Sequence, residues 1–186
     1  MKKYTYLLFV TMIGLVISCD DNDDPIPVNE EELITTVRLE LTPQGGGTAI
    51  ILESRDVDGL GPDDPVITVS SPLTVSQTYV GEMELLNESV TPSEDITEEV
   101  QDEGDEHQFF YQLSQDLATI SYADTDENGD PIGLSIQVET TAVGTANLTI
   151  TLRHEPNKSA AGVSDGDISQ AGGETDVQVV FPIEVE

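Results

Sequence analysis

The chain holds only two histidines, and each stands beside a glutamate at one end of a predicted strand. His107 follows Glu106 at the start of one alternating segment, and His154 precedes Glu155 at the end of another. Period-two alternation places both imidazoles on the apolar face of their strands. If these strands pair, or stack across a sandwich, the rings meet at one rim. Two imidazoles and a carboxylate would suit Zn²⁺ or Cu²⁺. The alternative is that each histidine separately hydrogen-bonds a loop backbone.

An oxygen-rich segment, residues 124–130, is a second candidate site. Its oxygen ligands alternate as they do at the start of a calcium-binding loop. An EF-hand would also need a glutamate at the twelfth position, where this chain has Ser135. A hairpin turn with Gly129 at positive φ explains the same residues. Under the calcium hypothesis the ligands would be Asp124, Asp126, Asn128 and Asp130.

Signatures of common enzymes give little support for catalysis. The sequence contains neither His-Glu-x-x-His nor a P-loop. Carboxylate pairs are too abundant in so acidic a chain to identify an acid–base site. We therefore expect a protein that is not an enzyme.

The only cysteine, Cys19, ends a segment laid out as an export signal. Two lysines precede an apolar stretch, residues 6–17, that is too short to span a membrane. The sequence Val16-Ile17-Ser18-Cys19 resembles the lipobox of bacterial lipoproteins. The resemblance implies cleavage before Cys19 and acylation of its thiol and amino group, and several acyl chains anchor a protein stably. The alternative is an ordinary cleaved signal peptide, residues 1–18, followed by a chance cysteine.

An acidic, proline-containing tract follows the cysteine. Residues 20–24 are four aspartates and one asparagine, and such a tract resembles the surface-export signal of Bacteroidota-type lipoproteins. The resemblance implies the outer face of the outer membrane, with the periplasmic face as the alternative. Residues 19–32 also have the composition of a solvated, self-repelling tether.

The charge of the chain excludes two classes of partner. Loss of Lys2 and Lys3 with the signal peptide leaves four basic residues against 37 acidic ones, a balance of −33. Phosphate backbones and bare anionic lipid surfaces are repelled by such a protein, so nucleic-acid binding is not expected. No cysteine follows Cys19, which excludes internal disulfides and cysteine-based zinc sites.

The remaining sequence, residues 33–186, predicts an all-β domain. Thr91-Pro92-Ser93-Glu94 has the form of a capping box, with Thr91 as the N-cap and Glu94 as the third helical residue. It predicts one short helix over residues 91–104. We expect hairpins between the first two strands and between residues 107–113 and 117–123, and Pro182 makes the last strand an edge strand. Residues 155–173 form a loop long enough to be functional or mobile. The predicted strands are residues 33–42, 48–53, 66–69, 78–86, 107–113, 117–123, 133–141, 145–154 and 175–185.

Short strands with turn signals and one short helix favour an antiparallel, immunoglobulin-like β-sandwich. Residues 31–37, 105–110 and 153–158 also resemble a family of small uncharacterised Bacteroidota lipoproteins. Some members of that family carry the label of the type 1 periplasmic-binding fold. This chain is shorter than a two-lobed α/β binder and lacks its helices.

These observations lead to two expected functions. The first is an outer-membrane-anchored sandwich that binds a small ligand or metal ion, or serves an outer-membrane transporter. The second is a structural or adhesive surface domain without a small-molecule site.

Overall fold

The computed structural model describes residues 33–56, 58–59 and 61–186. The predicted signal peptide, the predicted lipidation site at Cys19 and the predicted acidic tether lie outside these residues. Within the described part of the chain, no helix has both the length and the apolar character needed to cross a membrane.

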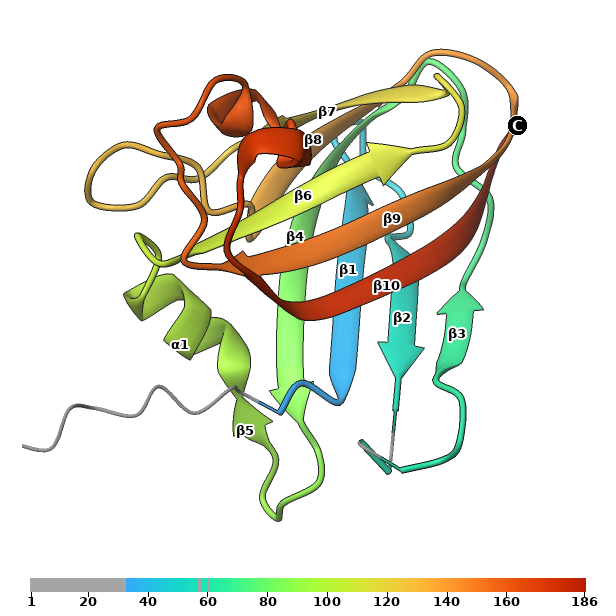
Figure 1. Cartoon of the computed structure of the whole chain (residues 1–186). Coiled ribbons are helices and arrows are strands. Elements are labelled where there is room, and N and C mark those ends of the chain that lie inside the picture. Colours follow the sequence, from blue (N-terminus) through green and yellow to red (C-terminus); the bar gives the residue numbers. More distant parts are fainter. Residues whose placement is uncertain (1–32, 57, 60) are drawn as a thin grey trace, which may run out of the picture. The chain divides into compact units, whose positions relative to one another are not determined.

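Among the described residues, the larger of two sheets contains seven strands in the order β3-β2-β1-β4-β8-β7, with β5 paired to β4 (Figure 1). Its pairings are antiparallel, and β1 and β2 form the predicted hairpin. The strands are β1 (Thr36–Pro43), β2 (Ile50–Arg55), β3 (Val66–Val69), β4 (Thr78–Asn87), β5 (Glu94–Asp95), β7 (Ala118–Tyr122) and β8 (Ser135–Thr140).

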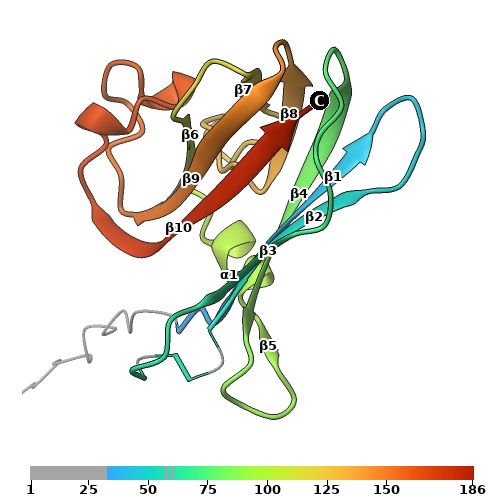
Figure 2. The ribbon, with the colours of Figure 1, turned by 90° about the vertical axis from the view of Figure 1, so that its right-hand side faces the viewer.

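The smaller sheet contains three antiparallel strands in the order β10-β9-β6. They are β6 (His107–Leu113), β9 (Gly144–His154) and β10 (Glu174–Val185). Figure 2 shows this sheet as a separate layer facing β1, β2 and β4. The predicted antiparallel β-sandwich is therefore confirmed, and β10 lies at the edge of its sheet as Pro182 indicated.

The core fills the space between the layers. Alternation along each strand sends its apolar side chains inward, so Leu39 and Leu52 of one sheet share a cluster with Phe109 and Phe181 of the other, all fully buried. Burial of each such side chain stabilises the fold by roughly 1.5–3 kcal/mol.

The predicted helix exists but begins later than the capping box indicated. Helix α1 spans Ile96–Asp102, and its N-cap is Asp95, whose carboxylate accepts a hydrogen bond from the Thr97 amide at 3.0 Å. Glu94, the expected third helical residue, instead pairs with β4 as part of β5. Placing Thr91 at the N-cap was therefore wrong. The helix starts where Ile96 and Val100 can be buried against the core.

The predicted hairpin between residues 107–113 and 117–123 was also wrong. Strand β7 pairs with β8 in the larger sheet, whereas β6 pairs with β9 in the smaller one. The chain therefore changes sheets after β6. A hydrogen bond at 2.6 Å from the Tyr122 hydroxyl to the Phe109 carbonyl joins β7 to β6. Burial raises the pKa of Tyr122 to about 12, so its phenol stays protonated and can donate.

The long loop, residues 155–173, covers the outer face of the small sheet (Figure 2). It contains the short helices η1 (Val163–Asp165) and η2 (Ile168–Gln170). Phe110 points away from the main core, yet it is fully buried with Val163 and Ala171 in a second apolar cluster. The Gln108 side chain donates to the Val163 carbonyl at 2.8 Å. These contacts hold the loop on the sheet.

Candidate metal centre

Strand register brings the two histidines together. His107 begins β6 and His154 ends β9, and the antiparallel pairing makes them direct cross-strand partners. Their rings are stacked, with centroids 4.8 Å apart and planes 26° from parallel. Of the arrangements that the sequence left open, the structure has the two imidazoles together through pairing within one sheet.

Asp176 is the third member of this group, and period-two alternation did not predict it. Its carboxylate oxygens lie 3.8 Å from His107 Nε2 and 3.8 Å from His154 Nδ1. The register of β10 against β9 shifts between Thr175 and Val177, which leaves Asp176 as the extra residue of a β-bulge. Bulges re-aim side chains and occur next to functional sites. The bulge turns Asp176 toward the histidines.

A backbone carbonyl fixes the tautomer of His107. Its Nδ1 lies 3.1 Å from the carbonyl oxygen of Glu103, which can only accept a hydrogen bond. Nδ1 therefore carries the proton and donates it, and the lone pair of the neutral ring is on Nε2, the nitrogen nearer Asp176. Histidine ligands of metals commonly have this outer hydrogen bond.

The group lies largely beneath the surface. The side-chain exposed fraction is 2% for His107, 6% for Asp176 and 14% for His154. One donor atom from each residue can be chosen so that all lie within 4.8 Å of one another. The His107–His154–Asp176 group could therefore hold a metal ion.

Ring orientation sets a condition on coordination. The lone pairs of stacked imidazoles lie in two nearly parallel planes and do not converge on one point. Metal–nitrogen distances of about 2.0–2.1 Å also require the donors to approach by a few tenths of an ångström. One ring must therefore turn when a metal binds. His154 is the more exposed ring, so we expect it to move.

The predicted set of His107, His154, Glu106 and Glu155 is divided between two groups. Glu106 and Glu155 do not join the buried ligands but form an exposed group with His154. Glu106 Oε2 lies 3.6 Å from His154 Nε2, and the Glu155 amide donates to the Glu106 carbonyl at 2.7 Å. His154 belongs to both groups through its two ring nitrogens.

Residues 124–130 form a turn in which protein donors already bind the first two predicted calcium ligands. The Asp124 carboxylate accepts from the amides of Gly133 and Ser135. Oδ1 of Asp126 accepts from the amides of Asn128 and Asp130, each at 2.9 Å. The geometry favours the hairpin-turn interpretation, with Gly129 at φ +90°.

The ammonium group of Lys158, in the long loop, lies beside this turn where the calcium hypothesis would place the metal ion. The Lys158 ammonium donates to Asp126 Oδ2 at 2.9 Å and to the carbonyls of Gly104 and Pro131. Burial alone would raise the pKa of Asp126. The hydrogen bonds from Lys158 and from the backbone outweigh burial, so its pKa lies below the usual value. Lys158 thus ties the loop to the segment that leads into His107.

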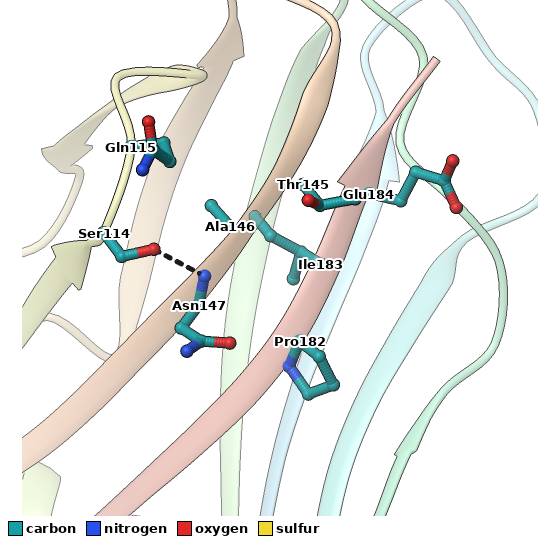
Figure 3. A pocket seen from close by; sticks show the side chains of 8 residues that line it. All are labelled: Ser114, Gln115, Thr145, Ala146, Asn147, Pro182, Ile183 and Glu184. Atoms are coloured by element: carbon teal, nitrogen blue, oxygen red, sulfur yellow. Dashed lines mark hydrogen bonds between the residues drawn. The ribbon is translucent and has the colours of Figure 1, made fainter.

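Two other features of the described chain do not form a reactive centre. Residues 162–166 match the letters Gly-x-Ser-x-Gly, but they span η1 in a surface loop and not the strand–helix elbow of hydrolases. An open hollow of about 470 Å³ lies at the far end of β9 and β10 (Figure 3). It contains none of the predicted ligands.

The comparisons with known proteins give no family. The chain matches no protein-family model, and neither a curated protein nor a solved structure shows significant similarity to it.

Proposed function

We propose that this chain is a membrane-anchored, non-enzymatic lipoprotein whose sandwich domain binds a transition-metal ion through His107, His154 and Asp176. The observation that carries the proposal is the convergence of these three side chains from three adjacent strands at a partly closed rim. A cation held at this rim would lie against the Asp176 carboxylate and within reach of both imidazoles.

The donor set favours Zn²⁺ or Cu²⁺ over calcium or magnesium. Imidazole nitrogens suit zinc and copper, whereas the other two ions prefer six or more oxygen ligands. Three protein donors leave a fourth position for water or a ligand, as in zinc sites that exchange ligands. The domain would then carry an exchangeable ion, which suits handover to a neighbouring outer-membrane transporter.

The location rests on the sequence around Cys19 and on the acidic tract after it. Acyl chains on this cysteine would hold the domain at the outer membrane, on the cell surface if the tract acts as an export signal. Mass spectrometry of the N-terminal peptide tests the anchor. We expect an acylated Cys19 and an unprocessed precursor for Cys19→Ala. An unmodified N-terminus would contradict the anchor.

Calorimetric titration tests the metal site. The mature chain with Cys19→Ser avoids a competing thiol, and we expect one equivalent of Zn²⁺ or Cu²⁺ to bind. Asp176→Asn removes a ligand and should weaken binding by at least about tenfold. Asp116→Asn is the matched control, since it removes an exposed carboxylate after β6. If the wild type and Asp176→Asn bind the metal ion with equal affinity, Asp176 is not a ligand and the proposed site is wrong.

The stacking of the two rings favours a second candidate, a structural or adhesive surface domain without a metal. In that case Asp176 and the two histidines only secure β10 to β9 and β6. His107→Ala would then destabilise the fold equally with and without added Zn²⁺. Stabilisation of the wild type alone by the metal would exclude this alternative.

A further inference from the structure

The exposed group at the rim suggests how an ion reaches the buried one. We propose that Glu106, His154 and Glu155 form a loading site that captures a divalent transition-metal ion and passes it inward through the His154 ring. This inference rests on the proposed metal function. It assigns Glu106 and Glu155 to transfer of the ion and not to its final coordination.

Exposure supports this order of events. Half of the Glu106 side chain is exposed, at 49%, and Glu155 is exposed as well. In the buried group, His107 and Asp176 are 2% and 6% exposed, so His154 is the member most open to solvent. An ion that enters by the most open side therefore meets His154 first.

The two nitrogens of His154 face the two groups. Nε2 lies 3.6 Å from Glu106 Oε2, and Nδ1 lies 3.8 Å from Asp176 Oδ1. A neutral imidazole has one lone pair, on one nitrogen at a time. The ring therefore binds an ion either at the rim or in the buried group. Transfer requires only that the ring turn and the proton change nitrogen, with no net reaction.

Backbone contacts hold the two rim carboxylates side by side. The hydrogen bond from the Glu155 amide to the Glu106 carbonyl joins the residues next to the two histidines. Glu155 also has a φ of +49°, an uncommon value for a residue other than glycine. Two carboxylates at one rim raise the local concentration of cations and so the rate of capture.

A loading site predicts a specific kinetic signature. A site that only speeds transfer must speed release by the same factor, since it does not change the final state. The double variant Glu106→Gln/Glu155→Gln should therefore lower the association and dissociation rate constants together, each by at least roughly tenfold. The dissociation constant and the stoichiometry of one ion per chain should not change.

Stopped-flow measurements with Zn²⁺ and a chromophoric chelator give both rate constants for the mature chain carrying Cys19→Ser. The control variant, Asp102→Asn/Asp105→Asn, removes two exposed charges from the neighbouring segment. The inference is supported if only the rim variant slows both rates at constant affinity.

Four other results would overturn it: unchanged rates, equal slowing in the control, faster dissociation with weaker affinity, or two equivalents bound by the wild type. If affinity still depends on Asp176 in any of these cases, the metal site stands and only the loading site fails. If no variant or wild-type chain binds Zn²⁺, both proposals fail.

Discussion

Replacement of Lys158 by methionine tests the contacts that hold the long loop against the turn of residues 124–130 and against the segment that leads into His107. The ammonium is buried and has three acceptors: Asp126 Oδ2 and the carbonyls of Gly104 and Pro131. The side-chain exposed fraction is 6% for Lys158 and 1% for Asp126. Methionine retains an apolar stem of similar length and removes the charge and all three donors.

These contacts determine how much stability Lys158→Met is expected to lose. Removal of one partner from a buried ion pair costs about 3–5 kcal/mol, because the other charge stays buried without compensation. Each of the two carbonyls loses a donor, at about 1 kcal/mol. Asp126 keeps the two amides on Oδ1, which limits the loss. We expect Lys158→Met to lower the free energy of unfolding by about 5 kcal/mol, a large part of the stability of an ordinary domain.

Urea unfolding followed by circular dichroism measures this difference. Because the single variant could unfold outright, Lys158→Met/Asp126→Asn is measured beside it. We expect the double variant to be more stable than the single one by at least about 2 kcal/mol, since it removes the unpaired charge. A loss below about 2 kcal/mol in the single variant, or no recovery in the double, would refute the reasoning.

Lowering the pH should narrow the difference in the free energy of unfolding between the wild type and Lys158→Met. In the wild type the pKa of Asp126 is lowered, so the stability contributed by the ion pair is present above the ordinary pKa of 3.8 and is lost as the pH falls below it. Without Lys158, only the two backbone hydrogen bonds oppose the effect of burial, so the pKa of Asp126 is higher in the variant than in the wild type. The difference in the free energy of unfolding between the two therefore narrows as the pH falls from 7 to below 3.8. If this difference in the free energy of unfolding stays constant over the pH range, the unpaired Asp126 carboxylate is not what destabilises the variant.

Three further changes test other parts of the fold. Gly173→Ala should lower Tm by at least about 2 °C, because φ is +69° and the new Cβ would collide with a carbonyl at the end of β9. Gly172→Ala, at φ +63° with open space around it, should lower Tm by less. Equal decreases in Tm for the two variants would show that the collision at Gly173 has no effect. The Arg55 hydrogen bond lowers the pKa of Glu88 from 4.5 to about 2, so the advantage of the wild type over Glu88→Gln, up to about 1 kcal/mol, should decline in urea titrations between pH 4.5 and 2. Tyr122→Phe removes the hydroxyl that joins β7 to β6 and should cost about 1 kcal/mol in the same assay, whereas no loss would indicate that this bond is dispensable.

Alternation along the chain was sufficient to predict the sandwich, and it placed both histidines on the apolar faces of their strands. Whether they meet depended on which strands pair, and the sequence left that open. His107 and His154 lie at opposite ends of strands that pair antiparallel, so one register determines both positions. Proximity in sequence was a poorer guide to pairing. Strand β7 follows β6 after a short turn, yet it joins β8, because the chain changes layers there. The burial of Phe110 likewise depends on Val163 and Ala171, more than fifty residues away in the sequence, which no local pattern describes.

Asp176 shows most clearly why a complete site could not be predicted. Continuation of the register from Val177 through Val185 would place Asp176 opposite Arg153, on the outer face, where the two side chains could form an ion pair. The bulge replaces that arrangement, and Arg153 donates instead to Thr175 Oγ1 at 2.7 Å. Period-two alternation has no means of indicating one extra residue.

The position of Asp176 at the bulge, rather than opposite Arg153, also affects the stability of the fold. An ion pair with Arg153 at the exposed surface would contribute at most about 1 kcal/mol. Burial of the same carboxylate beside two imidazoles costs several kcal/mol unless positive charge accompanies it. Repulsion in a chain with a formal net charge of −31 adds to that cost. A divalent cation shared by Asp176, His107 and His154, as proposed, would add positive charge beside this carboxylate. The bulge therefore places Asp176 beside the two histidines, and the proposed metal function makes it the carboxylate ligand of that group.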